Sequence, residues 1–379
     1  MMTRDRLRRE MEVSEANEEK TYKHFTLALF SGIQEPLKNL YDQTLAATKN
    51  FTSITSDIIR ANPKTIKTLR YCLAPVISQM RLGQIIELST TEAFEERGGV
   101  PTEQQAERLA RWFNDNLDRD RFQWLARPEM SSVEKGLADT YAKLWTVSLQ
   151  ANQNTATKYR TQRKEQQEKA IADALGRMGL KFQDKLGAPQ VPRPRRKRSD
   201  PPHPPPPKRF GGINEVDDVH PECYVKEKKI LGGSQKKQKS DLTARPTNAS
   251  NLFCIEAKAV GIRLDSTKRL KELNDKYTDW KGSGLPITTV GVVAGMFSDL
   301  ELVSTIKLRQ IPIFFEHDLD KLTRFLTTRE YYEAAWNPAD LFNEVPEAVL
   351  AEALEKIQTA PVDDETDAEQ KADDGLGAE

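Results

Sequence analysis

Three residues in the second half of the chain combine the side chains that metal-assisted phosphodiester chemistry requires. Asp241 is followed after fourteen residues by Glu256, and Lys258 lies two positions further on. A hard cation such as Mg²⁺ takes oxygen ligands, usually one or two carboxylates, with substrate phosphate oxygens completing its shell. Asp241 and Glu256 could supply the carboxylates, and the backbone carbonyl of Ala257 could add an oxygen. Lys258 could orient or help deprotonate the attacking water and offset charge on the phosphate.

The residues around Glu256 have the alternation of a β-strand. Residues 252–260 are mostly apolar, and successive side chains in a strand point to opposite faces. Glu256 and Lys258 are therefore expected to point the same way. A turn-forming stretch at residues 245–251 can fold residues 240–243 back against this strand, which would place Asp241 beside Glu256 on one face of a sheet.

The Glu-x-Lys pattern is weak when it stands alone. It occurs four times in this chain, at Glu18–Lys20, Glu227–Lys229, Glu256–Lys258 and Glu369–Lys371. Only the Glu256 copy lies in an apolar strand, follows an aspartate at hairpin distance and precedes an amphipathic helix. The alternative interpretation is a half-exposed strand that carries a surface ion pair, which is common on open sheet faces.

The arrangement Asp-x14-Glu-x-Lys in a strand–hairpin–strand frame resembles the PD-(D/E)xK nuclease superfamily. Further segments resemble the XamI-like family of type II restriction endonucleases, and together they span most of residues 60–335: residues 69–78, 120–125, 256–261, 265–272, Lys276, Trp280, 290–297 and 314–319. Ser240 stands where the name of the superfamily has proline, a position that varies widely among its members.

The resemblance implies a type II site-specific deoxyribonuclease that hydrolyses double-stranded DNA with Mg²⁺. It also implies a restriction–modification system with a cognate DNA methyltransferase as functional partner. A homodimer is expected, because one chain carries one such site and a duplex has two strands. Two alternatives stay open: a less specific repair or recombination nuclease of the same superfamily, and a catalytically inactive DNA-binding protein. No short motif specifies base contacts, so the recognition sequence is not predicted.

Composition divides the chain into four regions. Residues 1–185 are predicted to be mainly helical and to embrace DNA or dimerise. Residues 186–212 are rich in proline and arginine and form a predicted extended linker. Residues 213–340 are predicted to form a nuclease core with a central mixed β-sheet flanked by helices, so the fold class is α+β or α/β. Residues 341–379 are expected to be helical and then acidic and disordered.

Within the predicted core, helices and strands alternate after residue 260. Asp265 or Ser266 is expected to cap a helix that Gly282 and Gly284 end. An unbroken apolar run, residues 287–296, predicts a strand that is covered on both faces. The remaining elements are predicted as a helix at 300–308, a strand at 311–315 and a helix at 319–336.

Basic residues outside the site are candidates for contacts with DNA phosphates. Lys268 and Arg269 would open a helix beside the metal site, where the helix N-terminus also favours a phosphate. Four more candidates lie in a predicted long helical stretch, residues 132–175, and in the linker: Arg160, Arg163, Arg195 and Arg196. For the first two of these, a solvated helix face is an equally good interpretation.

The charge balance and the cysteines narrow the class of protein. There are 57 basic and 57 acidic residues, so phosphate contacts are expected to be concentrated in one cleft. The three cysteines form no Cys-x-x-Cys, which argues against a zinc site or a disulfide framework. The first twenty residues have no apolar core of a signal peptide, and no run is long enough to span a membrane. A cytoplasmic location is therefore expected.

Overall fold

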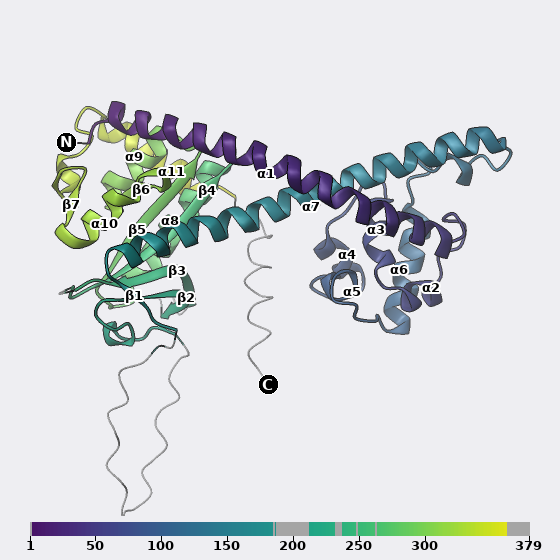
Figure 1. Ribbon diagram of the computed structural model, residues 1–379, viewed down its shortest axis with the longest axis horizontal. Coiled ribbons are helices and arrows are strands. Elements are labelled where there is room, and N and C mark those ends of the chain that lie inside the picture. Colours follow the sequence, from purple (N-terminus) through teal and green to yellow (C-terminus); the bar gives the residue numbers. More distant parts are fainter. Residues whose placement is uncertain are drawn as a thin grey trace, which may run out of the picture. The chain divides into compact units, whose positions relative to one another are not determined.

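The computed structural model describes residues 2–184, 186, 212–231, 237–247, 249–261 and 264–361. The chain forms two compact units (Figure 1). Of the described residues, those up to 23 and those from 161 onward form unit 1, and residues 24–160 form unit 2. Two long helices, α1 (Arg4–Ala47) and α7 (Ser132–Arg177), contribute to both units. The boundary predicted at residue 185 therefore differs from the observed division into units, because the chain passes from unit 2 into unit 1 at residue 161.

Two predicted regions lie largely beyond what the structure describes. Of the proposed linker 186–212, only Leu186 and Gly212 are described, so Arg195 and Arg196 lie outside the described residues. The acidic tail from residue 362 onward also lies outside them.

Unit 1 is built on a six-stranded mixed sheet with the strand order β1-β2-β3-β4-β5-β6. The strands are β1 (Lys181–Phe182), β2 (Cys223–Leu231), β3 (Lys237–Arg245), β4 (Leu252–Val260), β5 (Ile287–Gly295) and β6 (Ile313–Phe315). β2, β3 and β4 form an antiparallel meander, and β4, β5 and β6 are parallel. The predicted hairpin between residues 240 and 260 is thus the centre of the sheet.

Helices accompany the parallel part of the sheet, as Figure 1 shows. They are α8 (Leu264–Lys281), α9 (Asp299–Leu308), α10 (Leu319–Thr328) and α11 (Glu347–Thr359), with a small hairpin of β7 (Glu330–Tyr331) and β8 (Ala334–Ala335). The long crossovers through α8 and α9 are what parallel neighbours require. The predicted mixed sheet flanked by helices is confirmed.

Two predicted helix boundaries are wrong. The helix expected at 319–336 ends at Thr328, because Arg329 takes a left-handed conformation (φ 62°). Tyr331 follows in β7, where it is buried and its hydroxyl donates to the Ile313 carbonyl (3.1 Å). Helix α8 begins at Leu264, so both Asp265 and Ser266 lie inside its first turn and neither takes the cap position. The Ser266 hydroxyl donates instead to Glu301 Oε2 (3.0 Å).

The beginning of the chain belongs to the core of unit 1. Met2, which precedes α1, and Leu7 and Met11 of α1 are buried in the same apolar cluster as the inner residues of β4 and β5. Further along α1, the hydroxyl of Ser14 accepts a hydrogen bond from the buried N–H of Gly295 (2.9 Å). Strands β4 and β5 therefore pack against residues of α1 that precede them in the chain by more than two hundred positions.

Unit 2 is helical, as predicted. Besides parts of α1 and α7 it contains α2 (Ser56–Ala61), α3 (Thr65–Tyr71), α4 (Gln79–Ile85), α5 (Glu92–Glu95) and α6 (Glu103–Asn116), with a 3₁₀ turn, η1 (Gln123–Leu125). Helix α6 begins with a reciprocal capping box between Thr102 and Gln105. In the core of unit 2, Arg70 and Glu95 form a buried ion pair (3.2 Å).

The first half of α7 leaves an apolar stripe open. Val133, Leu137, Tyr141, Leu144 and Trp145 are each 47–71% exposed. Their spacing of three or four residues puts them on one face of the helix. We call these five residues the α7 stripe.

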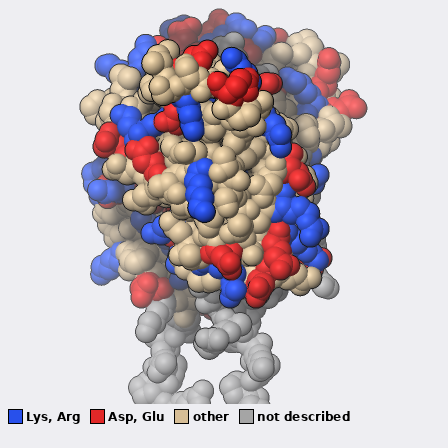
Figure 2. All heavy atoms as spheres, turned by 90° about the vertical axis from the view of Figure 1, so that its right-hand side faces the viewer, with Lys and Arg blue, Asp and Glu red and all other residues tan. Residues whose placement is uncertain are grey.

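The surface is otherwise mixed in charge. On the face drawn in Figure 2, positive and negative side chains are interspersed around a mostly uncharged centre, within which some positive side chains lie. Among the described residues, no helix is both long enough and apolar enough to cross a membrane.

Candidate active site

Strand β4 is buried on both of its faces. It pairs with β5 along its whole length, from Leu252 opposite Ile287 to Val260 opposite Gly295. Glu256 is 0% exposed and Lys258 is 9% exposed. Burial of charged groups is costly unless they are paired, so this strand is not the half-exposed one with a surface ion pair that the sequence also allowed.

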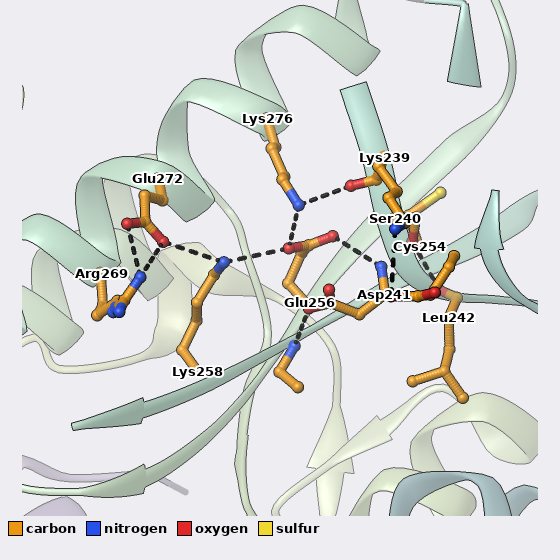
Figure 3. Close-up of polar contacts among 12 residues, drawn as sticks. Lys239, Ser240, Asp241, Leu242, Cys254, Glu256, Lys258, Arg269, Glu272 and Lys276 are labelled. Carbon is orange, nitrogen blue, oxygen red and sulfur yellow. Dashed lines mark hydrogen bonds and ion pairs between the residues drawn. The ribbon is translucent and has the colours of Figure 1, made fainter. Parts of the chain in front are cut away.

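Asp241 and Glu256 meet where strands β3 and β4 separate. The ladder pairs Leu242 with Ile255, and the same register puts Asp241 opposite Glu256. There the N–H of Asp241 donates to Glu256 Oε1 (3.3 Å), and the N–H of Ala257 donates to Asp241 Oδ2 (2.9 Å). Each carboxylate thus accepts an amide of the opposite strand, which brings the two acids together (Figure 3).

Two ammonium groups lie against Glu256. Lys276 Nζ, from α8, is 2.7 Å from Glu256 Oε2 and also donates to the backbone carbonyl of Lys239 (2.6 Å). Lys258 Nζ is 3.4 Å from the same Glu256 oxygen. The structure therefore brings Asp241, Glu256 and Lys258 together in one buried cluster and adds a second lysine to it.

Helix α8 extends this cluster with a row of alternating charges. Lys258 Nζ lies 3.3 Å from Glu272 Oε2, and Arg269 Nη1 donates to Glu272 Oε1 (2.8 Å). Sequence reasoning gave Glu272 and Lys276 no role. Their spacing from Arg269, three and seven residues, is the signal that could have found them, because such residues share a helix face.

Burial and neighbouring charges act on the two acids. Burial acts to raise the pKa of Asp241, but the positive charges of Lys276, Lys258 and Lys164 hold it below its ordinary value. The pKa of Glu256 is raised by its burial and by the charge of Asp241, against the pull of Lys276 and Lys258. Two adjacent buried carboxylates repel each other, so the pair attracts cations.

Helix α7 contributes side chains beside Asp241. Lys164 Nζ is 3.9 Å from Asp241 Oδ1, 3.6 Å from Glu168 Oε1 and 4.0 Å from Glu227 Oε1. Burial and the charge of Asp241 raise the pKa of Glu168 to about 7. Neither Glu168 nor Glu227 was assigned to the site from the sequence, since no local pattern shows that α7 packs beside β3.

Arg163 has a structural place. Its Nε donates to Glu18 (2.8 Å) and its Nη1 to Glu316 (3.0 Å), and its side chain is only 9% exposed. The guanidinium therefore links α1 to the end of β6. The sequence-based assignment of Arg163 to a DNA backbone, and the alternative of a solvated face, both disagree with this burial.

The other predicted DNA-contact residues differ in their surroundings. Arg160 is exposed on α7 in unit 2, and its Nε is directed toward the Ala156 carbonyl (3.5 Å). Lys268 and Arg269 are partly buried near the start of α8 in unit 1. For these three residues, contact with DNA stays a prediction.

The carboxylate pair has donors of the kind that Mg²⁺ prefers. Among the residues that the structure describes, no group of three or more His, Cys, Asp or Glu side chains is arranged to hold a metal ion. Mg²⁺ does not need such a cage, because it commonly binds one or two carboxylates and takes its other oxygens from water and substrate phosphate. Asp241, Glu256 and the carbonyl of Ala257 fit that requirement.

Comparison with known proteins identifies the family. Residues 49–314 match the family model described as XamI restriction endonuclease, which covers more than half of the 379 residues. The match includes Asp241, Glu256 and Lys258. No curated protein and no solved structure matches the chain. The chain therefore belongs to the XamI restriction endonuclease family.

Proposed function

We propose that this restriction endonuclease is a type II enzyme that uses Mg²⁺ to cleave double-stranded DNA at specific sites. We further propose that it works in a restriction–modification system with a cognate DNA methyltransferase. The observation that carries the metal-dependent mechanism is the meeting of two buried carboxylates, Asp241 and Glu256, with the Lys258 ammonium at the point where β3 and β4 separate.

In this mechanism the side chains have distinct tasks. Asp241 and Glu256, with the carbonyl of Ala257, would hold Mg²⁺, which when bound supplies Lewis acidity that polarises a phosphoryl oxygen and acidifies water. Lys258 is held between two carboxylates, Glu256 and Glu272, and this favours its ammonium form. It would offset the charge that develops on the phosphate. Water would add to phosphorus and lose a proton to the solvent as the bond to the 3′ oxygen breaks, and that oxygen would take up a proton, so the products are a 3′-hydroxyl and a 5′-phosphate.

Digestion of mixed duplex DNA tests this proposal. We expect discrete fragments with Mg²⁺, and none with EDTA or with Ca²⁺ as the only divalent cation. A smear would instead indicate a less specific nuclease of the same superfamily. Salt-dependent DNA binding without cleavage under Mg²⁺ or Mn²⁺ would show a catalytically inactive DNA-binding protein.

We also propose that the enzyme acts as a homodimer. One chain carries one cluster of Asp241, Glu256 and Lys258, whereas a duplex has two strands to cut. The α7 stripe offers a surface for the second copy, because monomeric proteins rarely expose apolar patches larger than a few hundred Å². Specific interfaces bury roughly 1,000 Å² or more in total, so the stripe would form the apolar centre of a larger contact surface.

Charge placed in the α7 stripe is expected to separate the two copies. The double variant Leu137→Glu, Leu144→Glu would bury two carboxylates at the interface, which is unfavourable. By light scattering after size exclusion, the unchanged protein should have twice its chain mass of 43.0 kDa, and the variant the chain mass itself. Lys135→Glu, on the same helix but outside the stripe, is the control and should stay dimeric. A monomeric unchanged protein, or a dimeric double variant, would contradict this interface.

A further inference from the structure

Lys276 spans the gap between the two strands that carry the acids. Its ammonium group donates to Glu256 on β4 and to the Lys239 carbonyl on β3, at 2.7 and 2.6 Å. It is closer to Glu256 than Lys258 is, and its side chain is 12% exposed. Figure 3 shows this ammonium between the Glu256 carboxylate and β3. The Lys276 ammonium therefore lies next to the carboxylate oxygen at which a metal ion bound by Glu256 would also lie.

Lys164 lies beside Asp241 together with Glu168 and Glu227, and the six charged side chains formed by the Asp241–Glu256 pair, Lys258 and helix α8 balance among themselves. Three acids, Asp241, Glu256 and Glu272, are matched by three bases, Lys258, Lys276 and Arg269. A divalent ion bound by Asp241 and Glu256 would add two positive charges within a few Å of an ammonium group that is already paired. Because like charges repel strongly at low effective dielectric constant, the ion must displace or outcompete that ammonium.

We propose that Lys276 is the resident counter-ion of Glu256, with which the divalent metal ion competes. This inference rests on the proposed metal site and assigns a role to a residue that the mechanism above does not use. Lys276 links Glu256 to β3, the strand that carries Asp241, before the metal arrives, and its charge limits how tightly the metal binds in the absence of DNA. The phosphate of bound DNA then contributes the negative charge that tips the balance toward the metal.

Calorimetric titration of the full chain with MnCl₂, without DNA and at pH 8.5, tests the competition. This pH lies well above the ordinary glutamate pKa. Lys276→Met and Lys276→Gln remove the charge, and the glutamine keeps hydrogen-bonding groups. Both should bind Mn²⁺ on the order of tenfold tighter, the effect of removing one nearby unit charge. Lys276→Arg keeps the charge and should match the unchanged protein.

Lys281→Met is the matched control. Lys281 lies on the same helix but is exposed, and its ammonium donates to the Tyr277 hydroxyl, away from the two acids. It should leave Mn²⁺ affinity unchanged. If both neutral Lys276 variants remain folded by thermal unfolding and bind Mn²⁺ no tighter than the unchanged protein, Lys276 is not a competing counter-ion. If the unchanged protein and Glu256→Gln give the same isotherm, the metal site itself is misplaced, which is a different failure.

Discussion

Glu256→Gln is expected to abolish DNA cleavage, lowering kcat by roughly 10³-fold or more, since several kcal/mol of metal-dependent transition-state stabilisation would be lost. The substitution keeps the size of the side chain and one oxygen that can accept the Asp241 amide. It removes the negative charge that Mg²⁺ requires and leaves the Lys276 ammonium without its carboxylate partner. The loss should therefore lie in the chemistry more than in DNA binding.

Single-turnover cleavage of a duplex that the unchanged enzyme cuts measures this effect. DNA affinity, followed with Ca²⁺ in place of Mg²⁺, should change much less than kcat. Glu352→Gln makes the same chemical change at an exposed position of α11 and should leave cleavage unaltered. Cleavage at the unchanged rate by Glu256→Gln would remove the carboxylate pair from the mechanism.

Gly295→Ala is expected to destabilise unit 1 by about 4 kcal/mol or to prevent folding, because it combines backbone strain with a clash in a packed core. Gly295 has φ +91°, a conformation that side chains disfavour, and an added Cβ would lie 2.0 Å from the carbonyl oxygen of Val260. The strand end would have to move, and with it the hydrogen bond from Gly295 to Ser14.

Urea unfolding followed by fluorescence measures the change in the free energy of unfolding. Gly32→Ala is the matched control, since Gly32 lies inside α1 with nothing within 4 Å of the added carbon. It should be neutral or stabilising by about 0.5–1 kcal/mol, because alanine favours the helix over glycine. Equal effects of the two substitutions would show that the close approach of β4 and β5 at Gly295 is not rigid.

The carboxylate pair could be predicted because its placement is nearly local. The apolar strand around Glu256 and the turn-forming residues 245–251 specify a hairpin, and hairpin register places residues opposite each other with few alternatives. The predicted strand bounds 252–260 are those of β4. The sequence could not show that both faces of this strand are covered, although that burial is what gives the Asp241–Glu256 pair its electrostatic character.

The residues that surround the pair could not be assigned in the same way. Glu168 reaches it from α7, which precedes β3 by some sixty residues, and its approach depends on how a long helix packs. Arg163 illustrates the opposite error: an arginine in a polar stretch of α7 suggests a solvated face, whereas two carboxylates from distant elements enclose it. The end of α10 was predicted wrongly because Tyr331 donates to the Ile313 carbonyl. The spacing of apolar residues in the sequence does not predict such a contact.

The amino-acid sequence by itself therefore determined the central hairpin, the helical character of unit 2 and the identity of the two acids and their neighbouring lysine. These depend on alternation, helical spacing and turn residues, which act over a few positions. Tertiary structure alone decided that Lys276 and Glu272 join the cluster, that Arg163 is internal, and that the first helix completes the sheet through Ser14. The physical reason is that charge pairing and burial depend on which elements pack together, and packing is set by contacts between residues far apart in the chain.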